Sequence, residues 1–355
     1  MAVIELIDHS TFAAAPGLSI LDAAQAAGLV LAHSCRTGRC GSCRTQVLAG
    51  QTRALLAETG LTAEESNAGW ILSCARAATT DLRLSAADLG ALAHIRSATW
   101  PCRINALHRL APDVMRVVLR LPPQARFVHL SGQYLTLIAR GGLRRSYSMA
   151  NAGATADAPQ GRVELHIRRV EGGALSRYWF DQARAGDLLR VHGPLGTFFL
   201  RDGAGRDLVF LATGTGMAPI LAMLQDLDKL PAARRPRSVT LLWGGRQPQD
   251  LYLVPERPGL RYLPVLSRAD ASWQGARGHV QQVLLQTPRD WANTVVYACG
   301  SAAMVQSARS GLVAAGLPAG QFYADAFVSS GATGLVPDAR ATGADSDQLQ
   351  MEATS

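Results

Sequence analysis

The sequence predicts a multidomain chain of α+β and α/β architecture, in which three domains of different pattern follow one another. Three observations support this. The chain has 355 residues, which is long for one domain; 48% are hydrophobic and 17% charged, as in packed globular proteins; and the spacing of apolar residues changes twice. The predicted domains span residues 1–88, 99–200 and 205–330. Residues 332–355 are mostly small or polar and lack aromatic side chains, which predicts a disordered tail.

The first segment begins with a strand and a helix and continues into a cysteine-rich loop. Ile4 and Leu6 alternate with Val3 and Glu5, as expected for a half-buried strand. Residues 20–28 form an alanine-rich helical pattern that ends at a glycine, and a further strand is predicted over residues 44–48. This mixture predicts a small α+β domain.

Four cysteines have a spacing that indicates one kind of metal centre. Cys35, Cys40 and Cys43 lie close together and Cys74 follows far downstream, which is the pattern C-x4-C-x2-C…C of a [2Fe–2S] cluster. Zinc is the alternative, but zinc ligands usually come as two C-x2–4-C pairs, which this arrangement is not. The sequence therefore predicts that these four thiolates hold a cluster that carries one electron.

The residues between these cysteines lead to further predictions. Gly38 and Gly41 permit the sharp turns that wrap a loop around a cluster. Arg36, Arg39 and Arg44 predict a basic rim that suits an acidic partner surface. Because the ligating thiols must stay reduced, a cytoplasmic setting is expected.

The second segment, residues 99–200, is predicted to be an antiparallel β-barrel or sandwich. Short strands with Gly- and Pro-rich turns between them are typical of such folds. The predicted strands are residues 114–120, 134–139, 163–170 and 188–192.

Two motifs in this segment predict a site for FAD. Arg145 can pair with a phosphate, Tyr147 can lie against a flat ring, and Ser148 can donate a hydrogen bond to the reactive edge of that ring. Two glycines and a serine that open a helix near residue 173 make an anion site for a pyrophosphate. The predicted FAD contacts are Arg145, Ser146, Tyr147, Ser148, His166 through its backbone, Arg168, Gly172, Gly173 and Ser176.

The third segment, residues 205–330, alternates strands with helices, which predicts a parallel sheet with covering helices. One stretch, residues 208–225, contains no charge, but its Gly214, Gly216 and Pro219 indicate a strand, turn and buried helix rather than a membrane span. The predicted strands are residues 208–212, 238–243, 262–265 and 294–298, and the predicted helices include 220–224 and 302–315.

Two turns in this segment predict a nicotinamide nucleotide site. The glycine-rich turn after residue 213 directs backbone amides at a phosphate, and Cys299 ends the last predicted strand, where ligands of open α/β sheets lie. Cys299 is placed to touch a nicotinamide, or else is a buried small apolar residue. Arg246 and Arg268 follow strands near the adenosine ribose, so NADPH stays open beside NADH. The predicted contacts are Thr213, Gly214, Thr215, Gly216, Pro219, Gly245, Arg246, Ser267, Arg268, Cys299 and Gly300.

In this order the motifs resemble the ferredoxin–NADP reductase superfamily, in the arrangement with an N-terminal plant-type ferredoxin. The resemblance covers about residues 1–330 and includes likeness to the CDP-6-deoxy-Δ3,4-glucoseen reductase family at residues 144–151, 193–199 and 324–328. It implies a β-grasp ferredoxin domain, a β-barrel FAD domain, an NAD(P)H-binding domain, and electron flow from NADH to FAD to [2Fe–2S]. It also implies that Tyr147, Ser148, Cys299 and Phe327 surround the reacting rings.

The resemblance also implies an electron-accepting partner protein, expected to be the dehydrase of CDP-3,6-dideoxysugar synthesis. One alternative is the reductase component of an aromatic-ring dioxygenase or monooxygenase, and another is a low-turnover flavin and nucleotide relay module. The net charge is +8, although residues 1–90 carry six Arg against eight acidic residues. Phosphate-bearing cofactors explain this excess better than nucleic acid. We expect a cytoplasmic monomer without membrane insertion.

Overall fold

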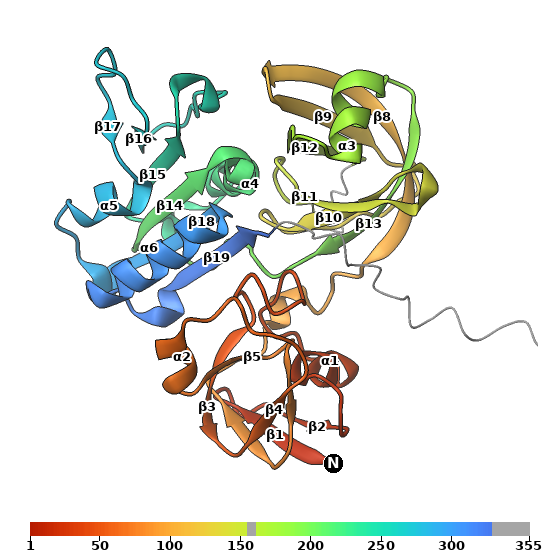
Figure 1. Ribbon diagram of the computed structural model, residues 1–355, viewed down its shortest axis with the longest axis vertical. Helices are drawn as coiled ribbons and strands as arrows, with labels where there is room; N and C mark the ends of the chain where they lie inside the picture. Colours follow the sequence, from red (N-terminus) through yellow and green to blue (C-terminus); the bar gives the residue numbers. More distant parts are fainter. Residues whose placement is uncertain (155–160, 329–355) are drawn as a thin grey trace, which may run out of the picture.

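The structure is a computed structural model that describes residues 1–154 and 161–328. It has three lobes, with the N-terminal lobe (red and orange) below the barrel lobe and the parallel-sheet lobe, which stand side by side (Figure 1). The predicted tail lies outside the described residues. Within the described part of the chain, no helix combines the length and apolar character needed to cross a membrane.

The N-terminal lobe is a five-stranded sheet with helix α1 (Ile20–Ala26) packed against it. The predicted alternation is confirmed, because Ile4 and Leu6 are fully buried while Val3 is half exposed. The sheet order is β2-β1-β7-β3-β5, with β1 and β7 parallel, for β1 (Ala2–Leu6), β2 (Thr11–Ala14), β3 (Arg44–Ala49), β5 (Trp70–Leu72) and β7 (Leu82–Leu84). The short strands β4 (Thr52–Ala54) and β6 (Arg76–Ala78) and helix α2 (Ala63–Asn67) complete the lobe.

The second lobe is a six-stranded antiparallel sheet that curls into a barrel. Its order is β11-β10-β13-β8-β9-β12, and an isolated bridge between Met149 and Leu165 brings its two edges together. All four predicted strands are confirmed, but β8 and β11 were not predicted as strands. The strands are β8 (Ala98–Ala111), β9 (Val114–Arg120), β10 (Tyr134–Ile138), β11 (Arg144–Ser148), β12 (Arg162–Arg168) and β13 (Leu188–Leu195). Helix α3 (Ala174–Arg177) and one π-helical turn cover one end of the barrel.

The third lobe is the predicted parallel sheet with covering helices, and these helices lie on both faces of the sheet. Its order is β17-β16-β15-β14-β18-β19, so the chain reverses direction across the sheet beside β14. Open α/β sheets bind ligands at such a switch point, outside the carboxyl ends of the strands. The strands are β14 (Asp207–Thr213), β15 (Ser238–Gly245), β16 (Leu260–Leu266), β17 (Ala276–Arg277), β18 (Thr294–Ser301) and β19 (Phe322–Phe327), and the helices are α4 (Met217–Asp228), α5 (Val280–Leu285) and α6 (Ala302–Ala314).

Candidate functional site

The four predicted cluster ligands come together as two sulfur pairs. The Sγ atoms of Cys43 and Cys74 are 3.2 Å apart. The Cys35 and Cys40 thiols form the other pair, with the amide of each donating to the sulfur of the other at 3.4 Å. A hydrogen bond from the Cys40 thiol, together with the amide donors, lowers the pKa of Cys35 to about 4, so this pair readily supplies a thiolate.

The pairing fits a [2Fe–2S] cluster, in which each iron takes two protein thiolates. Among the described residues, no group of three or more His, Cys, Asp or Glu side chains surrounds one metal position, as a mononuclear site would require. The loop also needs its glycines. Gly38 has a φ of +73°, and a Cβ there would lie 2.2 Å from the Ala57 carbonyl oxygen. Cys35, Cys40, Cys43 and Cys74 are therefore the residues that would hold the cluster.

The cysteine loop packs against both other lobes rather than facing solvent on every side. The Ser34 hydroxyl donates to the buried Asp325 carboxylate of β19 at 2.7 Å, and the Tyr134 hydroxyl of β10 donates to the Ser34 carbonyl at 2.9 Å. Cys40 is 9% exposed and belongs to the apolar core of the parallel-sheet lobe. The cluster site is thus held at the junction of all three lobes.

The predicted basic rim is wrong for two of its three arginines. Arg36 forms an ion pair with Asp22 of α1, and Arg44 donates to Glu65 of α2 at 3.0 Å. Both cations are balanced by carboxylates that lie distant in the sequence, which the local pattern does not reveal. Arg39 is exposed, and no hydrogen bond or ion pair of its side chain joins it to the described residues.

The predicted flavin motif forms β11, an edge strand paired with β10. Arg145 is exposed and, within residues 1–154 and 161–328, donates only to the neighbouring Arg144 carbonyl, so its guanidinium is available for a phosphate. Tyr147 packs on the barrel core, and its hydroxyl accepts a hydrogen bond from Trp179 at 3.3 Å. Ser148 is buried, and the Ser146 hydroxyl lies 3.0 Å from that of Thr136.

The residues predicted to bind the pyrophosphate lie after β12. Gly172 has a φ of +71°, and Gly173 is the N-cap residue of α3, which has only four residues. The Ser176 hydroxyl accepts a hydrogen bond from the Val170 amide at 2.8 Å, so it already stabilises this turn. The glycines therefore provide the open backbone here, and the serine fixes its shape.

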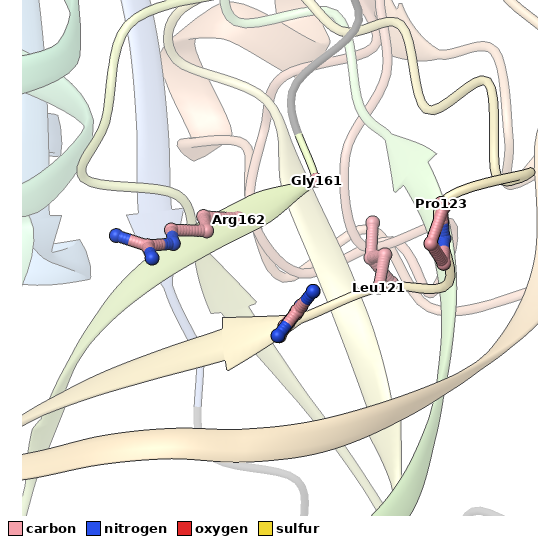
Figure 2. Close-up of a pocket in the computed structure, with 5 residues that line it drawn as sticks. Leu121, Pro123, Gly161 and Arg162 are labelled. Carbon is pink, nitrogen blue, oxygen red and sulfur yellow. The ribbon is translucent and has the colours of Figure 1, made fainter.

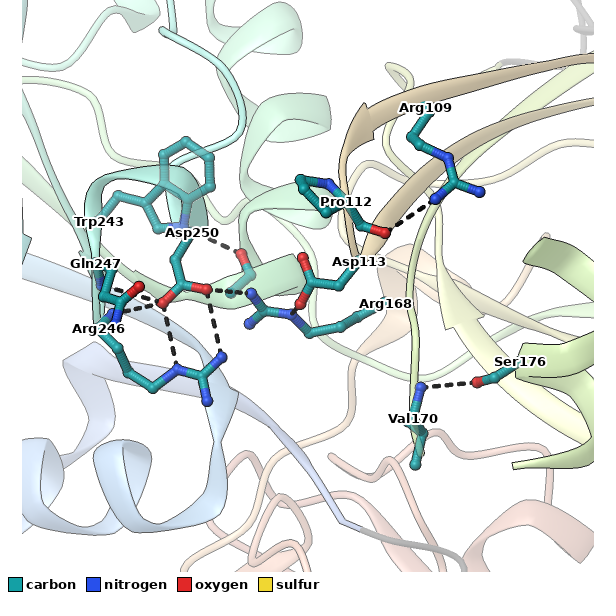
Figure 3. Close-up of polar contacts among 11 residues, drawn as sticks. Arg109, Pro112, Asp113, Arg168, Val170, Ser176, Trp243, Arg246, Gln247 and Asp250 are labelled. Carbon is teal, nitrogen blue, oxygen red and sulfur yellow. Dashed lines mark hydrogen bonds and ion pairs between the residues drawn. The ribbon is translucent and has the colours of Figure 1, made fainter. Parts of the chain in front are cut away.

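His166 and Arg168 join the barrel to the parallel-sheet lobe. The His166 ring lies 3.0 Å from the Tyr252 hydroxyl and 3.1 Å from Glu164. Arg168 donates to Asp113 at 2.8 Å and to Asp250 at 2.7 Å, as Figure 3 shows. Both side chains have structural partners in this arrangement. Their predicted contact with FAD would therefore be made by the backbone of β12.

Asp250 is the centre of this polar network and was not identified from the sequence. It is buried, and it accepts from the Arg246 amide at 2.7 Å and the Gln247 amide at 3.2 Å, besides Arg168. Burial acts to raise the pKa of Asp250, but the hydrogen bonds from Arg246 and Gln247 and the charge of Arg168 hold it below its usual value. The network fixes the end of β15 to the barrel (Figure 3).

Removing the charge of Asp250 is expected to weaken this connection much more than the same change at Asp113. Asp250→Asn leaves Arg168 without its buried partner, so we expect a loss of roughly 3 kcal/mol in stability. The Asp113 side chain is 37% exposed and makes one ion pair with Arg168, so Asp113→Asn should cost less than about 1 kcal/mol. Calorimetric unfolding of the two variants checks this, and equal losses would contradict it.

The two predicted nucleotide turns interlock at the carboxyl ends of β14 and β18. The Thr213 hydroxyl accepts from the Ser301 amide at 3.0 Å, and Gly300 has a φ of +138°. A Cβ on Gly216 would lie 2.2 Å from the Cys299 carbonyl oxygen. Gly214 has a φ of +54° and lies against the Arg168 guanidinium, while Thr215 and Pro219 complete the turn and the first turn of α4.

Cys299 and Phe327 have very different surroundings. Cys299 is fully buried in the apolar core beneath the turn, and burial raises its pKa well above the usual value, so the structure shows a buried small apolar residue. Its contact with nicotinamide stays a prediction. Phe327 is 40% exposed at the end of β19, where its side chain can contact a ligand.

The predicted adenosine residues follow β15 and β16 side by side. The Ser267 amide donates to the Gly245 carbonyl at 3.0 Å, and the Arg268 amide donates to the Arg246 carbonyl at 2.9 Å. The Arg246 guanidinium donates to Asp250, whereas the Arg268 side chain is exposed. Of the two candidate partners for a 2′-phosphate, Arg268 is therefore the one whose side chain has no partner in the described part of the chain.

A cavity of about 530 Å³ lies away from all these residues, at the ends of β9 and β12 (Figure 2). Arg120, Leu121, Pro123, Gly161 and Arg162 line it. None of the predicted site residues lines this cavity.

Comparison with known proteins agrees with the three-part organisation. A family described as "2Fe-2S iron-sulfur cluster binding domain" matches residues 6–79, one described as "Oxidoreductase FAD-binding domain" matches residues 101–200, and one described as "Oxidoreductase NAD-binding domain" matches residues 210–310. The domains predicted from the sequence, residues 1–88, 99–200 and 205–330, each enclose the matched range, and their boundaries stay predictions.

Relatives with known names match nearly the whole chain. The chain is 37% identical over 318 residues to CDP-6-deoxy-L-threo-D-glycero-4-hexulose-3-dehydrase reductase of Yersinia pestis, which covers 88% of this chain and 94% of that protein. It is 35% identical over 334 residues to terephthalate 1,2-dioxygenase reductase component 2 of Comamonas sp, covering 91% and 96%.

The fold is also found in solved structures. The Amycolatopsis cytochrome P450 reductase GcoB has a TM-score of 0.66 and 28% identity, covering 92% of this chain and 99% of that one. With domains for a [2Fe–2S] cluster, FAD and NAD on one chain, this protein is an NAD(P)H-dependent oxidoreductase. It belongs to the ferredoxin–NADP reductase superfamily, in the arrangement that places a plant-type ferredoxin domain before the FAD and NAD domains.

Proposed function

We propose that this reductase takes electrons from NADH and delivers them to the dehydrase of CDP-3,6-dideoxysugar synthesis. One observation carries the proposal: the 37% identity to the Yersinia pestis dehydrase reductase extends over 94% of that protein and includes the cluster domain, which must meet the partner. The Salmonella typhimurium protein RfbI is 35% identical over 318 residues, which cover 88% of this chain and 92% of RfbI.

When bound, FAD and the [2Fe–2S] cluster would supply the redox chemistry, because a flavin can exchange two electrons with a nicotinamide or one at a time with a one-electron cluster. The protein residues bind and orient these groups. Arg145 and the glycines at 172–173 are proposed to hold the FAD phosphates, and Tyr147, Ser148 and Phe327 to position its ring. The turns at 213–216 and 299–301 are proposed to bind the nucleotide, and the four cysteines to hold the cluster at the junction of the lobes.

The partner is tested by reconstitution with a purified pyridoxamine-dependent sugar dehydrase and its CDP-sugar. We expect deoxysugar formation to depend on both NADH and the reductase. The control is the same mixture with a Cys74→Ser reductase, which lacks one cluster ligand. If product forms no faster than with the dehydrase alone, while the reductase still reduces cytochrome c, the partner assignment is wrong and the reductase assignment stands.

A second candidate partner is an oxygenase, because the Comamonas terephthalate dioxygenase reductase is 35% identical over 96% of its length. The same reductase preparation, mixed with a terephthalate-type oxygenase, tests it directly. Faster turnover with the oxygenase than with the sugar dehydrase would reverse our preference. Failure to reduce cytochrome c or any other acceptor would instead indicate a low-turnover relay module.

NADH is proposed as the preferred donor, because Asp250 engages the guanidinium of Arg246, one of the two candidate partners for a 2′-phosphate. We expect kcat/KM for NADH to exceed that for NADPH by about tenfold or more, the equivalent of 1.4 kcal/mol. Asp250→Asn should lower the ratio of kcat/KM for NADH to kcat/KM for NADPH, because the Arg246 guanidinium would then be free to meet a 2′-phosphate. Steady-state kinetics with both nucleotides check this, and equal use of NADPH by the parent protein would contradict it.

We also propose that the protein acts as a cytoplasmic monomer. A cluster held by four thiolates needs a reducing compartment, and the three cofactor domains lie on one chain, so no second copy is needed to complete the electron path. Sedimentation of the cofactor-loaded protein tests the monomer, and a dimer at micromolar concentration would overturn it.

A further inference from the structure

Arg44 places a buried positive charge against the cysteine loop. Its side chain is 9% exposed, and it donates to the Gly60 carbonyl at 2.8 Å and to Glu65 at 3.0 Å. A Cβ on Gly41 would lie 3.3 Å from the Arg44 guanidinium, so that group packs on the backbone between Cys40 and Cys43. Arg44 thus faces the cluster site from within the ferredoxin lobe.

Arg309 adds a second positive charge from another domain. It lies on α6, donates to the Phe322 carbonyl at 3.3 Å, and holds its guanidinium 4.7 Å from the centre of the Phe322 ring. Cys40 belongs to the same apolar core as Phe322, and the charges of Arg44 and Glu65 act on Arg309, so Arg309 lies on the side of this domain that faces the ferredoxin lobe. Burial lowers the pKa of Arg309 to about 9, with Arg44 adding to the shift and Glu65 opposing it.

The two positive charges of Arg44 and Arg309 are not balanced by the one negative charge of Glu65. Glu65 is the single carboxylate that reaches Arg44, and no ion pair of Arg309 occurs among the described residues. Arg309 is partly buried, and a partly buried cation without a carboxylate partner is stabilised by a nearby anion. Two ferric ions, two sulfides and four thiolates sum to a charge of about −2, which becomes about −3 on one-electron reduction. The cluster is the anion that this excess charge fits.

We propose that Arg44 and Arg309 raise the reduction potential of the cluster, with Glu65 opposing them, and that docking of the nucleotide domain therefore helps to set that potential. The physical reason is Coulombic. A nearby cation stabilises the reduced cluster more than the oxidised one, because the reduced cluster carries one more negative charge. Both arginines are positioning residues, and the inference does not depend on which protein accepts the electron.

The test is a redox titration of the cofactor-loaded Arg309→Gln protein, following the reduced cluster by electron paramagnetic resonance and the flavin by absorbance. We expect the cluster midpoint to become more negative by about 30 mV or more, a threefold change in the equilibrium constant at 59 mV per tenfold. The flavin midpoint in the same sample should stay unchanged. Glu65→Gln, which retains a side chain able to cap α2, should shift the cluster midpoint in the opposite direction.

Two controls separate charge from packing. Arg309→Lys keeps the charge and should stay close to the parent potential. Arg289→Gln removes a partly buried arginine from the same domain. Arg289 lines a cavity with Asp207 and Arg261 away from the cluster, so this variant should leave the midpoint potential of the cluster unchanged. An unchanged midpoint in Arg309→Gln would overturn the proposal. If that variant does not fold, a Glu65→Gln shift to a more negative potential would overturn it equally.

Discussion

Replacing Cys74 by serine is expected to abolish electron delivery from this reductase while leaving its reaction with NADH intact. Cys74 lies after β5, on a different element from the cysteine loop, and its sulfur lies 3.2 Å from that of Cys43. Without the Cys74 thiolate, one iron of the cluster would have one protein ligand instead of two. Changes in outer-shell partners already cost about 10–100-fold, so losing a ligand should lower NADH-dependent cytochrome c reduction by roughly 100-fold or more.

Cys74 belongs to the core of the ferredoxin lobe, and the barrel has a core of its own, so the flavin should still bind and be bleached by NADH. Cys102→Ser is the matched control, because Cys102 is equally buried but lies in the barrel, outside the cysteine pattern. Absorbance of the cluster, flavin bleaching and cytochrome c reduction are measured on both variants. Wild-type cytochrome c reduction by a Cys74→Ser protein that has lost its cluster absorbance would show that electrons leave from the flavin instead.

Much of the fold could be predicted because each segment has its own periodicity. The strands β9, β14 and β18 are marked by alternating or continuous apolar runs, and the structure contains them within a few residues of the predicted limits. The cluster site is marked by spacing alone, since four cysteines at these intervals have few other uses. Features that depend on the local pattern of residues, such as these strands and the cluster site, could therefore be predicted from the sequence.

The rest depends on contacts between residues far apart in the chain. β8 was missed because residues 98–111 alternate poorly and contain a proline, yet pairing on both sides makes a 14-residue strand. Arg36 and Arg44 seemed to form a basic rim, but folding supplies carboxylates from α1 and α2. Asp250 became prominent only when the barrel placed Arg168 beside it. The partners of these charged side chains lie far apart in the sequence, so the ion pairs become visible only in the folded structure.

The second large effect is expected at Gly216, where alanine should disrupt both nucleotide turns at once. Its φ of −59° suits any residue, so the cost is purely steric. The new Cβ would lie 2.2 Å from the Cys299 carbonyl oxygen and 2.8 Å from the Gly300 Cα. Both contacts are with backbone, so the turns after β14 and β18 must separate. Overpacking of this kind costs about 1–3 kcal/mol.

Because these two turns are the proposed nucleotide site, Gly216→Ala should raise the Kd for NADH by about tenfold or more. Gly320→Ala is the matched control: it makes the same change in the same domain, at a position where a Cβ would meet nothing within 4 Å. Titration calorimetry with NAD⁺ and flavin bleaching by NADH measure the effect, while FAD content and cluster absorbance show that the other domains are intact. A Gly216→Ala protein that binds nucleotide as tightly as Gly320→Ala would place the nucleotide away from the end of β14. The Gly-rich turn would then serve only to pack β14 against β18, and the site would have to be sought along β15 and β16.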